Sequence, residues 1–81
     1  MNKIRITPED IESAISQEDY AIMGKKTTVC LLTLKNGFEV VGTSGCVDPA
    51  NFDAPIGRKF ARDQAVEKIW MLEGYRLQGS L

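Results

Sequence analysis

The chain has 81 residues, of which 43% are hydrophobic and 26% charged, and its net charge is −1. This ordinary globular composition excludes disordered and collagen-like classes, and the missing basic excess argues against phosphate-driven binding to duplex nucleic acid. Because the chain has no histidine and two cysteines, it excludes Ser-His-Asp triads, Cys-His nucleophilic pairs and His-containing zinc sites within one chain.

The first predicted element is a helix that begins after Thr7. Threonine is a favourable N-cap residue, and Pro8–Asp10 then combines a proline suited to the first helical position with two acids that face the positive end of the helix dipole. Ile11, Ala14 and Ile15 follow at the spacing of one apolar stripe. Because the pattern fades after Ile15, it predicts a helix of about ten residues.

The middle of the chain predicts an antiparallel hairpin after a break at residues 24–26. Two runs rich in β-branched and apolar residues, 27–35 and 38–46, flank the pair Asn36 and Gly37. An Asn-Gly pair between such runs is typical of a two-residue type I′ turn, which needs positive φ at both residues.

That turn also predicts the register of the two strands. It pairs Leu32 with Val41 and Thr33 with Val40, so apolar side chains would lie on both faces of the hairpin. A half-solvated hairpin alternates apolar and polar residues instead. The sequence therefore predicts that both faces need covers and that both edges need partners.

A long C-terminal helix is the last predicted element. Asn51 or Asp53 can cap it, Ala54 and Pro55 fit its first turn, and Gly74 is the natural C-terminal stop. The tail that follows is predicted to be a strand or a packed extension.

This helix has two apolar stripes, and its small residues would allow another element to approach closely. One stripe consists of Ala54, Ala61, Ala65, Ile69 and Leu72, and the other of Ile56, Phe60, Val66, Trp70 and Met71. A chain this short hides only about 60% of its unfolded surface. The sequence therefore predicts an α+β fold (N-terminal helix, antiparallel hairpin, long C-terminal helix) in one domain, residues 1–81, that forms a homo-oligomer. The alternative is a monomer whose first helix and tail cover enough of the apolar surface.

Polar side chains gather around the predicted start of the long helix. The polar ones are Thr43, Ser44, Asn51, Arg58, Lys59 and Arg62, and the aromatic Phe52 lies among them in the sequence. A helix N-terminus beside cations favours a phosphate or carboxylate, so these residues form the candidate ligand site. The alternative is a local network in which Arg58 pairs with Asp53 or another acid. Because turn and cap roles explain Asp48 and Asp53, we expect no catalytic residue, no metal and no cofactor.

Four segments of the chain resemble a known phage family. They read TTVCLLTLKNGF (27–38), CVDPANFD (46–53), IGRK (56–59) and KIWMLEGY (68–75). The sequence is similar to the small tailed-phage proteins named after gene product forty-nine of an Escherichia phage and gene sixty-six of a Shigella phage. The resemblance covers about residues 9–77. The chain has Met71 where many relatives have proline, and Gly45 where many have alanine.

The resemblance implies a phage- or prophage-borne protein of the infected bacterial cytoplasm, from a family with no enzymatic assignment. Because the chain lacks histidine and a matched acid–base pair, we expect it not to be an enzyme. By analogy with small accessory phage proteins, we expect it to bind something of the host. The first hypothesis is sequestration of an anionic, nucleotide-like molecule, such as a host immune signal, between protomers. The second is inhibition of a host protein through strand edges or exposed aromatic residues. No apolar stretch approaches the roughly 20 residues that span a membrane, so no membrane partner is expected.

Overall fold

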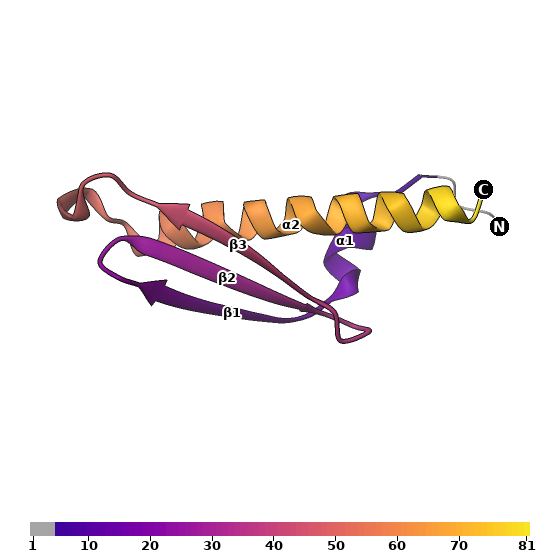
Figure 1. Cartoon of the computed structure of the whole chain (residues 1–81), viewed down its shortest axis with the longest axis horizontal. Helices are drawn as coiled ribbons and strands as arrows, with labels where there is room; N and C mark the ends of the chain where they lie inside the picture. The colour runs from indigo at the N-terminus through magenta and orange to yellow at the C-terminus, as the bar shows by residue number, and fades with distance from the viewer. Residues whose placement is uncertain (1–4) are drawn as a thin grey trace.

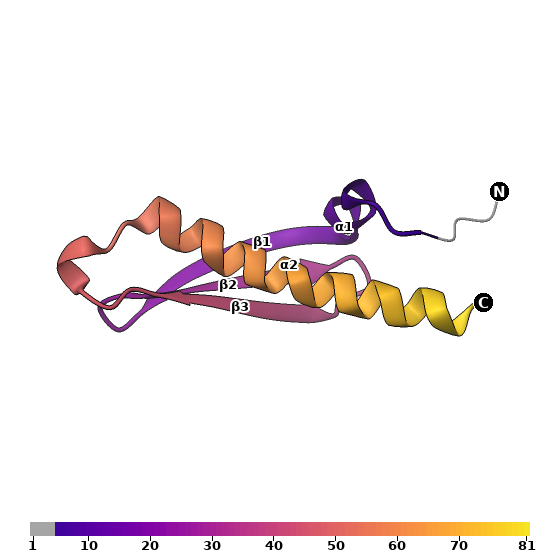
Figure 2. The same cartoon turned by 90° about the horizontal axis from the view of Figure 1, so that it is seen from above.

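The computed structural model describes residues 5–81, and Figures 1 and 2 show its arrangement. In chain order the elements are α1 (Pro8–Ala14), β1 (Ile15–Met23), β2 (Thr27–Leu34), β3 (Glu39–Gly45), the short 3-10 helix η1 (Pro49–Asn51) and α2 (Ala54–Gly79). Within this part of the chain the strands form an antiparallel sheet in the order β1-β2-β3, and α2 lies along one of its faces. The predicted α+β order of helix, hairpin and long helix is confirmed, and the sheet has one strand more than the hairpin.

Helix α1 begins where the sequence predicts and ends earlier. The Thr7 hydroxyl accepts from the Asp10 backbone N–H, and the Asp10 carboxylate accepts from the Thr7 N–H at 2.8 Å, which completes a capping box. The helix spans seven residues, because Ile15 already has extended backbone angles and opens β1.

Strand β1 was not predicted from the sequence. Residues 17–19 are polar, and only Glu18, Tyr20 and Ile22 alternate on the face that α2 covers. Because β1 lies at the edge of the sheet, polar side chains there stay in water at little cost, and pairing with β2 overrides the weak local preference. Gly24, with φ +75°, then turns the chain into β2.

The hairpin β2–β3 is confirmed, but its predicted register is wrong by one residue. Gly37 has φ +92° and Asn36 does not have positive φ, so the turn is not type I′. The Gly37 N–H donates to the Leu34 carbonyl at 2.9 Å, and the Leu34 N–H donates to the Phe38 carbonyl at 2.8 Å. These bonds enclose a three-residue loop of type I turn plus glycine bulge. Leu32 therefore pairs with Val40 instead of Val41.

The corrected register gives the sheet one covered and one open face. Every second residue of β2 and β3 points toward α2, and the buried ones are Thr28, Cys30, Leu32, Val40 and Gly42. The open face carries Val29, Leu31 and Val41, and β1 adds Ala21 and Met23 beside them. The prediction that both faces carry apolar residues is therefore confirmed. The residues of β3 lie on the face opposite to the predicted one, so that Val40 instead of Val41 shares a face with Leu32.

Helix α2 begins at the predicted cap and runs further than predicted. The Asp53 carboxylate accepts from the Ile56 N–H at 3.1 Å, so Asp53 is the cap. The predicted stop at Gly74 is wrong, because the helix continues to Gly79. An ion pair between Glu73 and Arg76 spans the glycine and offsets part of the cost of its low helix propensity.

The alanine stripe of α2 lets the helix touch the sheet. Ala61, Ala65 and Ile69 are fully buried against it. A Cβ atom at Gly42 would lie 2.1 Å from the Ala61 carbonyl oxygen and 2.4 Å from the Ala65 nitrogen. The predicted close approach is therefore confirmed, and a glycine on β3 is what completes it.

Candidate functional site

The start of α2 offers less backbone to an anion than the sequence suggested. Pro55 has no N–H, the Ile56 N–H is taken by the Asp53 carboxylate, and the Gly57 N–H donates to the Asp53 carbonyl. Attraction for an anion here therefore depends on cationic side chains rather than on open helix amides.

The structure distributes the seven predicted site residues over separate places. Ser44, Asn51 and Phe52 line a hollow of about 210 Å³ on the β3 side of the helix start. Thr43 lies on the outer edge of β3, where its backbone N–H donates to the Gln64 side chain at 2.7 Å. Arg58 lines a different hollow, on the β1 side.

Lys59 and Arg62 are held in ion pairs with acidic side chains, as in the alternative interpretation of the polar residues. The Lys59 ammonium lies 2.9 Å from the Asp63 carboxylate one helical turn away, and 5.3 Å from the centre of the Phe60 ring. Arg62 donates to both oxygens of Glu12 on α1, at 3.1 and 2.7 Å, and to Glu18 on β1 at 2.9 Å. Arg62 on α2 thus connects α1 and β1 to the helix and has a structural role instead of the predicted ligand-binding role.

The Arg62 contacts change the acidity of both glutamates. Hydrogen bonds from the guanidinium hold the pKa of Glu12 and of Glu18 below the ordinary value of 4.5, and partial burial opposes the effect. Because each pKa is lower in the folded state, the pairs stabilise the fold above the unfolded-state value and stop doing so as pH falls through the folded-state value.

We therefore expect acid to weaken the wild type more than an Arg62→Gln variant. As pH falls from neutral to well below 4.5, the wild type should lose about 0.5 kcal/mol of unfolding free energy per pair beyond the loss in the variant, as is usual for half-exposed pairs. Urea unfolding at a series of pH values measures this. Parallel stability–pH curves for the two proteins would contradict the assignment.

Among the cations of the predicted site, Arg58 is the one without a partner in the described residues. It makes no hydrogen bond or ion pair with any other residue in the range 5–81. The predicted pairing with Asp53 is therefore absent from the part of the chain that the structure describes. A cation one turn into a helix is unfavourable against the dipole unless an anion accompanies it.

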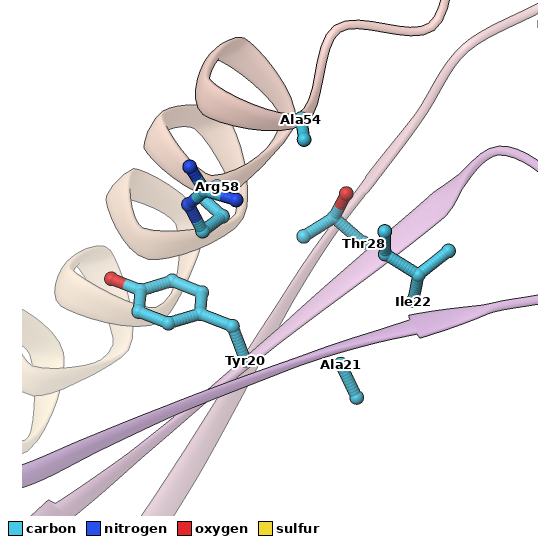
Figure 3. Close-up of a pocket in the computed structure, with 6 residues that line it drawn as sticks. All are labelled: Tyr20, Ala21, Ile22, Thr28, Ala54 and Arg58. Atoms are coloured by element: carbon cyan, nitrogen blue, oxygen red, sulfur yellow. The ribbon is translucent and has the colours of Figure 1, made fainter.

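The hollow beside Arg58 lies between the first turns of α2 and the β1–β2 edge of the sheet (Figure 3). Its volume is about 270 Å³, and its lining is mostly apolar. The residues that line it are Tyr20, Ala21, Ile22, Thr28, Ala54 and Arg58. The Tyr20 hydroxyl donates to Glu18 at 2.8 Å, and burial together with this bond raises the pKa of Tyr20.

A buried hydroxyl without a partner stands in the wall of the same hollow. Thr28 is 1% exposed, and its Oγ1 atom has no hydrogen-bond partner among residues 5–81. Figure 3 shows this oxygen pointing toward the start of α2. A Cβ atom at Gly57 would come within 2.6 Å of it, so the glycine leaves the hydroxyl its space. An unsatisfied buried hydroxyl costs free energy, which a ligand with a polar group could recover.

Sequence reasoning missed Tyr20 and Ile22 as lining residues, because it did not recognise β1. It also missed Thr28, which lies in a predicted strand but reaches the hollow only through the fold. Polar and apolar residues do not alternate before the turn at Gly24, since Glu18 and Asp19 are both polar and residues 20–23 are all apolar.

No group of three or more Cys, Asp or Glu side chains within residues 5–81 is placed to hold a metal ion. No helix within residues 5–81 is both long and apolar enough to cross a membrane.

Comparison with known protein families places the chain. The sequence model of the family described as "Phage protein (N4 Gp49/phage Sf6 gene 66) family" matches residues 6–81. No curated protein and no solved structure matches the chain significantly.

Proposed function

Because the chain belongs to the N4 Gp49/phage Sf6 gene 66 family of phage proteins, we propose that it is a non-enzymatic accessory protein of phage infection. In this proposal it acts in the cytoplasm of the infected bacterium as a homo-oligomer. It binds and sequesters an anionic, nucleotide-like molecule of the host, such as an immune signal.

The observation that carries the proposal is the uncommitted Arg58 at the mouth of an apolar hollow. An anionic group there would offset the unfavourable position of the guanidinium near the helix start. The Tyr20 ring and the Ile22 side chain offer apolar contact to a planar ring, and the Thr28 hydroxyl offers a hydrogen bond. This combination of one cation, apolar walls and a single polar group suits a phosphate or carboxylate attached to a ring.

The size of the hollow supports the oligomeric part of the proposal. At about 270 Å³ it lies below the range of roughly 300–1,000 Å³ that holds drug-sized ligands, so one chain would enclose only part of a nucleotide. Large apolar side chains also remain exposed on α2, among them Ile56, Phe60 and Met71. A second copy could cover such residues and add walls to the hollow.

Inhibition of a host protein is the second candidate. It is favoured by aromatic residues that stand in solvent, such as Phe38 and Tyr75, of which Tyr75 is 85% exposed. Stoichiometric recovery of one host protein with the purified chain, without retained nucleotide, would support it.

The test of sequestration is an Arg58→Ala variant, with Lys59→Ala as the matched control. The probes are a panel of mononucleotides, dinucleotides and cyclic nucleotides, and binding is measured by calorimetry. We expect Arg58→Ala to weaken binding at least about tenfold, because a charged hydrogen bond contributes about 1.5–3 kcal/mol. Lys59→Ala should leave binding unchanged.

Unfolding free energies of the same variants complete this test. Arg58→Ala should change stability by less than about 0.5 kcal/mol, as for an exposed side chain without partners. A large loss of stability would assign Arg58 a structural role, and absence of any heat with the wild type would remove the sequestration hypothesis.

A further inference from the structure

The two edges of the sheet differ in whether side chains occupy their backbone groups. On β3, the Thr43 N–H donates to the Gln64 side chain, and the Val41 carbonyl accepts from the Lys68 ammonium. Both partners come from α2, so the helix occupies two backbone groups of the outer edge of β3 and hinders pairing with another strand there. On β1, no side chain of residues 5–81 bonds to the backbone of Ile15–Met23.

The open edge of β1 is long and exposed. It spans nine residues, and all except Ile15 are exposed. Neither Figure 1 nor Figure 2 shows an element alongside its outer edge beyond the α1 end. Such an edge carries unpaired N–H and C=O groups that can pair with a further strand.

The chemistry of β1 changes along its length in a way that suits pairing with itself. The middle of the strand is acidic at Glu18 and Asp19, the last four residues are apolar, and the turn that follows is basic at Lys25 and Lys26. In an antiparallel pair of identical strands, the acidic part of one copy comes beside the basic turn of the other.

We propose that β1 is the surface through which two copies of this chain associate, antiparallel about a two-fold axis, so that their sheets become one. The interface gives the oligomer of the proposed function one contact surface, and it leaves Ile56 and Phe60 on the β3 side of α2 uncovered. It rests on that function only for the role of the hollow beside Arg58.

Charge selects the position of the two-fold axis. An axis at Asp19 would set this carboxylate directly opposite its own copy, which is destabilising. An axis at Ala21 instead sets Tyr20 opposite Ile22 of the second copy and brings Lys25 diagonally to Asp19, a separation that a lysine side chain can reach. The apolar half of the strand then pairs with itself, and opposite charges flank it.

This arrangement would also extend the hollow beside Arg58. Tyr20 and Ile22 lie on the face of β1 that α2 covers, and both line the hollow. The Ile22 of the second copy would therefore stand beside Tyr20 at the outer wall. One copy thereby adds apolar surface to the site of the other.

The test is a charge exchange across the interface, read as native mass by sedimentation equilibrium over a concentration series. We expect the wild type to be dimeric at high concentration. Asp19→Lys and Lys25→Glu should each weaken association about tenfold, because every substitution acts twice in a two-fold pair. The double variant, with both charges exchanged, should associate as the wild type does. Lys35→Glu, an equal charge reversal at the opposite end of the sheet, should have no effect.

Other outcomes overturn the interface or separate it from the function. A monomeric wild type would overturn the proposed interface. A dimer that is unaffected by Asp19→Lys and Lys25→Glu, but dissociates with Val41→Lys on the open face of the sheet, would overturn it as well. Circular dichroism of every variant verifies that it is folded. A dimer that binds no nucleotide would support the interface and contradict the sequestration hypothesis. Nucleotide binding by a monomer would support sequestration and contradict the interface.

Discussion

Replacing Gly42 with alanine is expected to lower the unfolding free energy by about 3 kcal/mol or more. The added Cβ would lie 2.1 Å from the Ala61 carbonyl oxygen and 2.4 Å from the Ala65 nitrogen. Both are backbone atoms of a long helix, so no side chain can turn aside to make room. Relief requires α2 to move away from β3, which opens the packing around Val40 and Ile69.

Gly45→Ala is the matched control, because it makes the same change at the end of the same strand. Nothing lies within 4 Å of a Cβ at Gly45, and its φ is not positive, so its effect should stay within about 0.5 kcal/mol. Urea unfolding followed by circular dichroism measures both variants. Similar stabilities would show that α2 does not rest on β3 at Gly42.

The second large effect is expected at Leu32. Its side chain is fully buried beneath α2, so Leu32→Ala should cost about 2–5 kcal/mol through lost burial and the cavity left behind. Leu31→Ala, one residue earlier, removes the same atoms from the open face, where the side chain is only half-buried, and should cost about 1 kcal/mol. The difference between the two unfolding free energies reports which face of β2 the helix covers.

A double-mutant cycle then tests the register itself. Leu32 and Val40 are directly opposite each other, so alanine substitutions at the two positions should couple by about 0.5 kcal/mol or more. The Leu32 and Val41 pair, on opposite faces, should show no coupling. Coupling of Leu32 to Val41 alone would instead restore the two-residue turn.

The strongest local signals in the sequence predicted the fold well. Thr7 and Asp53 cap α1 and α2 as predicted, because a short polar side chain can accept from the free N–H groups of a first turn that contains proline. The pair Asn36 and Gly37 did mark the hairpin turn. However, Asn36 can adopt either sign of φ, and the difference between a two- and a three-residue loop shifts every side chain of one strand relative to the other.

Features set by tertiary contacts escaped sequence reasoning. Strand β1 exists because β2 offers it a hydrogen-bonding edge, and no local pattern at Gln17–Asp19 indicates this. Helix α2 passes Gly74 although glycine is a weak helix former, and the flanking Glu73 and Arg76 pair across it.

The candidate site was predictable only in part, because most of its walls are also set by tertiary contacts. The cation at Arg58 was visible in the sequence. The hollow beside it needed Tyr20 and Thr28, which only the fold brings near.

The lengthwise course of α2 makes the molecule convenient to label. Figure 1 shows the helix running along most of the long axis, with η1 beyond its start and the C-terminus at the other end. At about 1.5 Å per residue, the C-terminus lies roughly 35 Å from Arg58. A fluorophore or affinity tag attached after Leu81 would therefore leave the hollow unobstructed. In an antiparallel pair of copies, two such dyes would stand at opposite extremities, and weak energy transfer between them would report the orientation of the pair directly.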